Sequence, residues 1–132
     1  MKANYEYVQD YLNAGVEMRI KAEEVLKDFG KELDVLDLCD QHLAERTGIK
    51  RGDENFEDAF REHVYAETYQ CIYIDKYGNG TLCTIEKIKY DKETNNISVF
   101  LNSDEGFISE WFDTSQIYDD EAVYMTILYF IG

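Results

Sequence analysis

The apolar residues of this chain repeat with two different periods, and the change from one to the other falls near residue 69. Before that point, apolar side chains recur every three or four residues, as they do along one face of a helix. After it, short runs such as CIYI and TLCTIEKIKY are rich in β-branched and aromatic residues and are separated by polar turns. We therefore predict an α+β fold in one domain, with a helical part in residues 1–68 and a β part in residues 69–132.

The first predicted helix runs from Asn4 to Phe29 and ends at Gly30, since glycine commonly terminates helices. Gly15 and Ala22 lie on its apolar seam, where two small residues would let another helix approach closely. If the second and third helices do not cover this seam, we expect a homodimer that forms through the first helix by close contact at Gly15.

Two further helices are expected in the helical part, which makes about three in all. One lies within residues 31–47, stops at Gly48 and should fold back on the first helix as a hairpin of helices. The other begins with Asp53 as its N-cap and continues through Phe60 to Val64.

The β part opens with two runs around a Gly-Asn-Gly sequence, which is typical of a β-hairpin. If Gly78 and Asn79 are the two central turn residues, Ile72 faces Ile85 and one face of the hairpin is apolar. The competing register would place Ile72 opposite Lys87, so we prefer the first.

The second strand of this hairpin changes the face on which its apolar residues lie. Ile85 belongs to one alternating set and Ile88 to the other, which predicts a bend or a β-bulge between them. After the polar turn DKETNN, the next strand should pair Ile88 with Val99 and Tyr90 with Ile97.

The rest of the β part predicts a strand at FISEWF, a short helical turn at DTSQIY and a last strand at AVYMTILYFI. The result is a five-stranded antiparallel sheet, and the bent second strand and the helical turn before the last strand make it similar to a small SH3-like or Tudor-like barrel. That resemblance implies a groove lined by aromatic residues that binds peptides or modified side chains. Trp111, Phe112 and Tyr118 would mark this groove.

The chain is strongly acidic, with 28 Asp and Glu against 13 Lys and Arg and a formal net charge of −15. Residues 93–132 hold eight of the acidic residues and no basic ones. Such a surface repels phosphates and anionic lipids, so we expect no direct binding of nucleic acid or membrane and a basic protein or peptide as the partner. No leader-like or membrane-spanning apolar run is present, which favours a cytoplasmic location.

Three cysteines, an odd number, indicate free thiols in a reducing compartment. Cys39 and His42 have the spacing C-x-x-H, and together with His63, Glu67 or Cys71 they could build a zinc site. Cys39, however, lies on an apolar helical stripe, where a cysteine acts as a small hydrophobic residue. We expect no metal and no cofactor.

Taken together, these features favour a non-enzymatic, cytoplasmic, acidic interaction module that binds a basic protein surface or peptide. Trp111 and Phe112 should point to opposite faces of their strand, so that only one of them belongs to the core. The predicted partner-binding residues are Trp111, Tyr118, Asp119, Asp120 and Glu121.

Two alternatives stay open. In the first, the protein mimics nucleic acid and inhibits a DNA- or RNA-binding protein through rows of carboxylates. The candidate rows are Asp113, Asp119, Asp120 and Glu121 in the β part, and Glu54, Asp58 and Glu62 in the third helix. In the second, the protein is a small enzyme that uses His63 and Cys71 as base and nucleophile.

Overall fold

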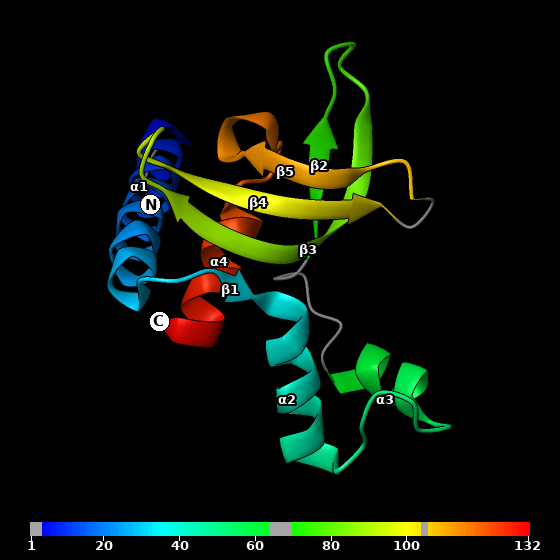
Figure 1. Ribbon diagram of the computed structural model, residues 1–132. Coiled ribbons are helices and arrows are strands. Elements are labelled where there is room, and N and C mark those ends of the chain that lie inside the picture. The colour runs from blue at the N-terminus through cyan, green and yellow to red at the C-terminus, as the bar shows by residue number, and fades with distance from the viewer. Residues whose placement is uncertain (1–3, 64–69, 104–105) are drawn as a thin grey trace.

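A computed structural model describes the backbone of residues 4–63, 70–103 and 106–132, and their side chains from residue 15 onward except at residues 62 and 63. Helices come first and most of the strands follow, so the predicted α+β class is confirmed (Figure 1). The elements in chain order are α1 (Asn4–Phe29), β1 (Leu33–Asp34), α2 (Val35–Thr47), α3 (Phe56–His63), β2 (Gln70–Ile74), β3 (Gly80–Asp91), β4 (Asn96–Ser103), β5 (Ser109–Asp113), the 3-10 turn η2 (Thr114–Gln116) and α4 (Glu121–Ile131).

The long strand β3 organises a five-stranded antiparallel sheet. Strand β4 pairs along one edge of β3, and β5 pairs with β4. Along the other edge, β2 pairs with the first part of β3 and the two-residue strand β1 pairs with Ile88 and Lys87. The sheet has the predicted number of strands, although β1 was not predicted.

The predicted pairing of Ile88 with Val99 and of Tyr90 with Ile97 is confirmed, and so is the bulge. The register of β3 against β4 shifts between Ile85 and Lys87, so Glu86 is the extra residue. One extra residue brings Ile85 and Ile88 to the same face of the sheet, and both are fully buried.

The predicted register of the β2–β3 hairpin is wrong. Ile72 pairs with Leu82 rather than with Ile85. The connection is longer than a two-residue turn, because the Asp75 carboxylate accepts hydrogen bonds from the backbone N–H groups of Tyr77 and Asn79 and holds a wider loop.

The last segment, predicted as a strand, is the helix α4. Its buried residues are Val123, Tyr124, Thr126 and Ile127, a spacing that only a helix can direct to one side. The sequence AVYMTILYFI is apolar almost throughout, so it carries no clear alternation that would separate the two structures.

Helix α1 packs mainly against α4, and not against α2 as a hairpin of helices (Figure 1). The predicted helix ends at Gly30 and Gly48 are confirmed, and both glycines have the positive φ angles that such ends require. Asp53 is not the side-chain cap of α3, because its carboxylate accepts from the backbone N–H of Lys50 in the preceding turn.

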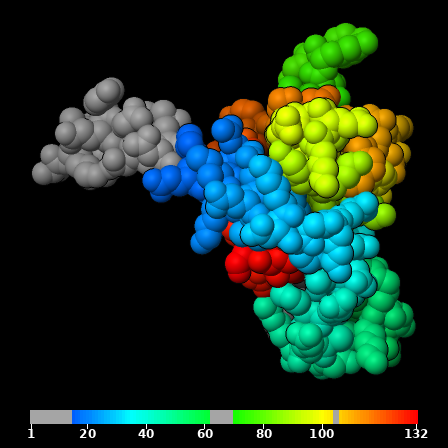
Figure 2. All heavy atoms as spheres, turned by 60° about the vertical axis from the view of Figure 1, so that its left-hand side comes forward, coloured from blue at the N-terminus to red at the C-terminus, as the bar shows by residue number. Residues whose placement is uncertain are grey.

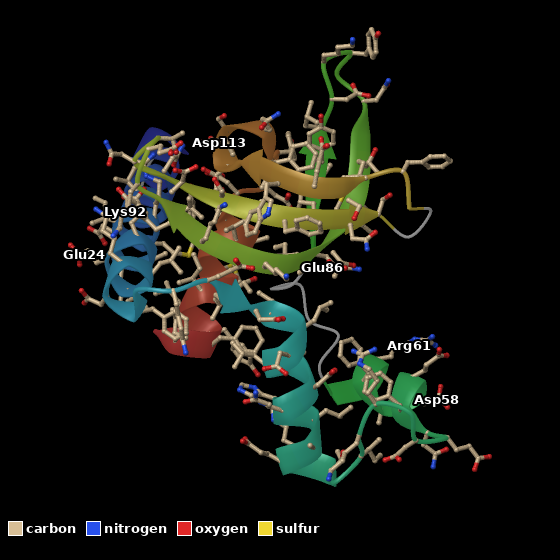
Figure 3. The ribbon with its side chains drawn as sticks, viewed as in Figure 1. Glu24, Asp58, Arg61, Glu86, Lys92 and Asp113 are labelled. Atoms are coloured by element: carbon tan, nitrogen blue, oxygen red, sulfur yellow. The ribbon has the colours of Figure 1, made fainter. Side chains whose placement is uncertain are left out.

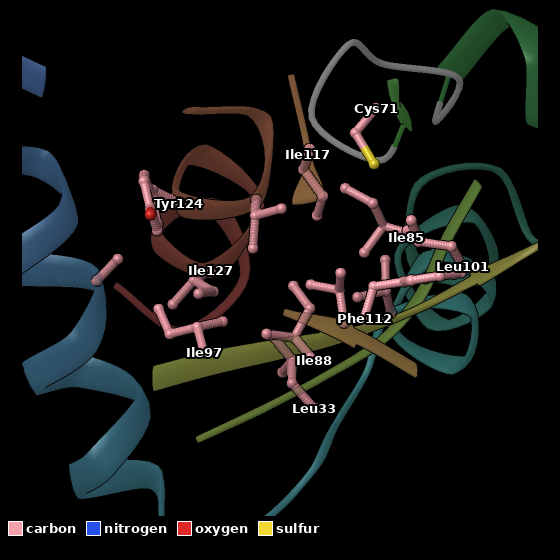
Figure 4. Packing of buried hydrophobic residues seen from close by; sticks show 14 of the residues in the cluster. Leu33, Cys71, Ile85, Ile88, Ile97, Leu101, Phe112, Ile117, Tyr124 and Ile127 are labelled. Carbon is pink, nitrogen blue, oxygen red and sulfur yellow. The ribbon is translucent and has the colours of Figure 1, made fainter. Parts of the chain in front are cut away.

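The main core lies between the concave face of the sheet and the pair α1 and α4 (Figure 4). Phe112 and Ile117 belong to it, with exposed fractions of 7% and 6%. Ile117, which follows β5, forms an isolated β-bridge to Tyr73 of β2. Among the described strands β5 does not pair with β2, so the sheet does not close into a barrel. None of the described helices combines the length and the apolar character that crossing a membrane requires.

Candidate functional site

Residues 118–121, for which the sequence predicts an exposed acidic corner, connect η2 to α4. The turn before them is fixed by a capping box, in which the Asp113 carboxylate accepts from the backbone N–H of Ser115 and the Gln116 side chain accepts from the backbone N–H of Asp113. The chain therefore enters the corner in a defined direction.

Two hydrogen bonds attach the corner to the edge of β2. The backbone N–H of Tyr118 donates to the carbonyl of Ile72 over 2.9 Å, and the backbone N–H of Ile72 donates to Oδ1 of Asp119 over 2.8 Å. Asp119 is only partly buried. This carboxylate therefore stabilises the fold as well as charging the surface.

Asp120 is also engaged within the protein. Its Oδ2 accepts a hydrogen bond of 3.0 Å from the hydroxyl of Tyr124, whose side chain is nearly buried. Burial, and then the neighbouring Asp120 charge, raise the pKa of Tyr124 well above its usual value. Glu121 stands in the first turn of α4, where the helix dipole favours a negative charge. Tyr118 is 76% exposed.

Trp111 lies away from this corner. It is on the face of β5 opposite to Phe112. Phe112 is buried and Trp111 is not, so the prediction that only one of the two belongs to the core is confirmed. The indole packs edge-on against Phe100, with 5.6 Å between ring centroids, and the ammonium of Lys89 lies 4.2 Å from the indole centroid. The five predicted partner-binding residues therefore form two separate groups, Trp111 in one and residues 118–121 in the other.

A groove lies beside the corner, with a volume of about 340 Å³. We call it the acidic groove, and its lining residues are Gln70, Leu82, Asp119, Glu121, Ala122 and Met125. Leu82 and Met125 are exposed by 54% and 42%. The groove thus combines an apolar wall with two carboxylates.

The sequence could not place Leu82 and Met125 in this groove. Leu82 reaches it only in the register in which it pairs with Ile72. Met125 reaches it only because its segment is a helix, since α4 turns the side chain of Met125 to the side of Glu121 and Ala122.

The thiols are poorly suited to nucleophilic chemistry. Cys71 and Cys83 face each other across β2 and β3, and all three cysteines are buried and outside any disulfide. Burial raises the pKa of Cys71 well above its usual value, and the Asp119 charge raises it further, so the reactive thiolate is scarce. Within the described residues, no group of three or more His, Cys, Asp or Glu could hold a metal ion. The side chain of His63 and the whole of Glu67 lie outside those residues.

The two rows of carboxylates considered for nucleic-acid mimicry lie in different parts of the molecule. Asp113 and Asp58 mark the two regions in Figure 3. Both oxygens of Asp113 accept from the side-chain amide of Asn96, over 2.9 Å each. With Asp119 and Asp120 also hydrogen-bonded, three of the four carboxylates in the first row have partners inside the protein. In the second row, the side chain of Glu62 lies outside the described residues.

Comparisons with known proteins returned no match, whether to a protein-family model, a curated protein or a solved structure. The functional interpretation below therefore depends on the residues and the geometry of this chain.

Proposed function

We propose that the protein is a non-enzymatic interaction module that binds a basic segment of another protein in the acidic groove. The observation that carries this proposal is the position of the exposed Leu82 and Met125 beside the carboxylates of Asp119 and Glu121. A lysine or arginine side chain has the same two parts, an aliphatic stem and a cationic head. Its stem would pack on the apolar wall while its head meets the carboxylates.

The charge of the surrounding chain favours the same class of partner. No basic residue occurs between positions 93 and 132, which include the corner and all of α4. A basic partner would therefore approach through an attractive field, and acidic competitors would be repelled. Tyr118, exposed and adjacent to Asp119 in the chain, supplies an aromatic side chain that a partner could cover.

The test uses random peptides displayed on phage, selected against the wild-type protein. We expect enrichment of peptides that combine Lys or Arg with apolar residues. In the variants Glu121→Gln and Met125→Ala, the affinity for an enriched peptide should fall about fivefold each, because an exposed ion pair or a small apolar contact contributes about 1 kcal/mol. Both substitutions suit a helix, so the fold should be kept.

The matched control is Glu45→Gln, which removes one exposed carboxylate from α2 that does not line the groove. It should leave peptide affinity unchanged. Asp119 is not used as a test position, because removing its carboxylate also breaks the hydrogen bond to Ile72. Enrichment of acidic peptides, or equal losses in Glu121→Gln and Glu45→Gln, would refute the proposal.

Nucleic-acid mimicry is a weaker alternative. A mimic needs rows of carboxylates that are free to replace phosphates, and the carboxylates of Asp113, Asp119 and Asp120 already accept hydrogen bonds within the protein. An enzyme that uses His63 and Cys71 is weaker still, because the Cys71 thiol is fully buried.

A further inference from the structure

A second cavity gathers positive charge in this acidic protein. It has a volume of about 540 Å³ and lies between the C-terminal end of α1 and the end of β3. We call it the lysine pocket, and its lining residues are Leu26, Lys27, Gly30, Lys31, Glu32, Lys89, Tyr90 and Lys92. On the face shown in Figure 2, the end of α1 and the β3–β4 turn lie side by side, and Figure 3 shows Lys92 next to α1.

The four lysines are a large share of the 13 basic residues in a chain with a net charge of −15. In the part of the chain that the structure describes, none of the four forms an ion pair. The ammonium of Lys27 lies over the ring of Tyr90, which lines the pocket, whereas those of Lys31 and Lys89 lie over Phe29 and Trp111, which do not. Four like charges around one cavity repel one another, so an anion inside it would be stabilised.

Glu32 supplies the one carboxylate among the lining residues, and a lysine outside the pocket forms an ion pair with it. Glu32 lies 3.7 Å from the ammonium of Lys87, which does not line the cavity. The carbonyl end of α1 carries a partial negative charge, which Lys27 and Lys31 offset. Four lysines and one paired carboxylate therefore line the pocket.

Beneath the lysines, the walls of the pocket are apolar. Leu26 is 1% exposed, and the ring of Tyr90 lies 4.7 Å from the ammonium of Lys27. The pocket opens at the sheet edge, because β1 pairs with β3 only as far as Ile88 among the described strands. A volume of this size is in the range of sites for small molecules.

We propose that the lysine pocket binds a small organic anion that has an apolar or aromatic body and a carboxylate, sulfonate or phosphate head. The body would contact Leu26 and Tyr90, and the head would meet the ammonium groups of Lys27 and Lys92. A bounded cavity with an apolar wall fits such a molecule better than it fits an acidic polypeptide, which needs an extended surface. This proposal concerns a different surface from the acidic groove and does not depend on it.

Two fluorescent probes with the same ring system test the proposal. They are 8-anilino-1-naphthalenesulfonate, which is an anion, and N-phenyl-1-naphthylamine, which lacks the sulfonate and is neutral. We expect the anion to bind more tightly, with an affinity that decreases as salt is added. Amide chemical shifts should move at Gly30 and at residues 89–92.

The test variant is Lys27→Gln with Lys92→Gln, and the matched control is Lys50→Gln with Lys76→Gln, which removes the same charge elsewhere. The first should weaken the anionic probe by about fivefold per lysine and leave the neutral probe unchanged, whereas the control should change neither. Thermal unfolding of each variant checks that the fold is intact.

Displacement of the probe separates the classes of ligand. Displacement by 1-naphthyl phosphate or by 1-naphthoate supports the proposal and identifies the preferred head group. Displacement by poly-glutamate but by neither small anion would overturn it in favour of an acidic polypeptide. Equal binding of the two probes, or equal losses in the test and control variants, would also overturn it.

Discussion

Several aspartates of this chain accept hydrogen bonds that stabilise turns and helix ends, which the acidic composition alone does not indicate. Asp34 accepts from the backbone N–H of Asp37 and caps α2, Asp75 holds the loop between β2 and β3, and Asp113 bonds the side chain of Asn96. These roles are typical of aspartate near turns and helix starts. The sequence does not identify these roles, because only the folded chain brings the hydrogen-bond donors near the carboxylates.

The buried thiol of Cys39 predicts a dependence of stability on alkaline pH. Burial raises the pKa of Cys39 from 9.0 to about 12, and Asp40 beside it acts in the same direction. Between these two values the unfolded chain has lost the thiol proton and the native protein keeps it. The free energy of unfolding should therefore fall as the pH rises, by up to about 1.4 kcal/mol per pH unit for this thiol.

In Cys39→Ala, the free energy of unfolding should fall less steeply with rising pH than in the wild type, by up to about 1.4 kcal/mol per pH unit. Urea unfolding at a series of pH values measures it, and the difference at neutral pH gives the separate cost of the lost packing. Cys71 and Tyr124, whose pKa values are also raised, account for part of the remaining decrease. Identical slopes in wild type and variant would contradict the prediction.

At the level of elements, the sequence predicted the pairing of β3 with β4 correctly, because the positions of the apolar side chains set this pairing. The bulge at Glu86 and the pairing of Ile88 with Val99 follow from apolar residues that must reach one face. The β2–β3 hairpin was predicted with the wrong register, because the length of its loop depends on the hydrogen bonds of Asp75.

Deleting Glu86 should prevent cooperative folding. Without the extra residue, Ile88 and Tyr90 would move to the opposite face of the sheet, and the core would lose their packing. The expected result is loss of the cooperative thermal transition in circular dichroism. The matched control is Glu86→Gln, which keeps the chain length and the acceptor for the Asn102 amide, and should change the unfolding free energy by less than about 0.5 kcal/mol. A deletion variant that unfolds like the wild type would contradict this role of the bulge.

At the level of the whole molecule, surfaces of opposite charge lie toward opposite ends of β3. Leu82 of the acidic groove is near the start of this strand, and Lys89 of the lysine pocket is near its end. A ligand at one surface therefore need not contact the other, and the two proposals can fail independently.

In this fold, part of the surface of α1 expected to form a homodimer is already covered by the rest of the chain. The packing of α4 and the sheet covers the seam of α1 at Ala22 and Leu26, which are almost fully buried. At Gly15, a Cβ atom would meet nothing within 4 Å. A homodimer would therefore have to use the part of the seam around Gly15.

Sedimentation of wild type and of Gly15→Leu tests this. We expect the bulky leucine to weaken self-association at least about tenfold, because it blocks a close approach of two helices. Glu24→Gln, on the exposed side of α1, serves as the control and should sediment like the wild type. Equal sedimentation of wild type and Gly15→Leu would contradict a dimer through this residue.

The sequence by itself determined the features that depend on local sterics and periodicity. These are the extent of α1, the helix ends at Gly30 and Gly48, the bulge in β3 and the pairing of β3 with β4. The tertiary structure decided the rest, because an apolar segment such as AVYMTILYFI takes the form that its neighbours can cover. As the helix α4, this segment packs against α1 and turns Met125 toward the acidic groove. The lysine pocket likewise combines residues 26–32 with residues 89–92, which no local pattern connects.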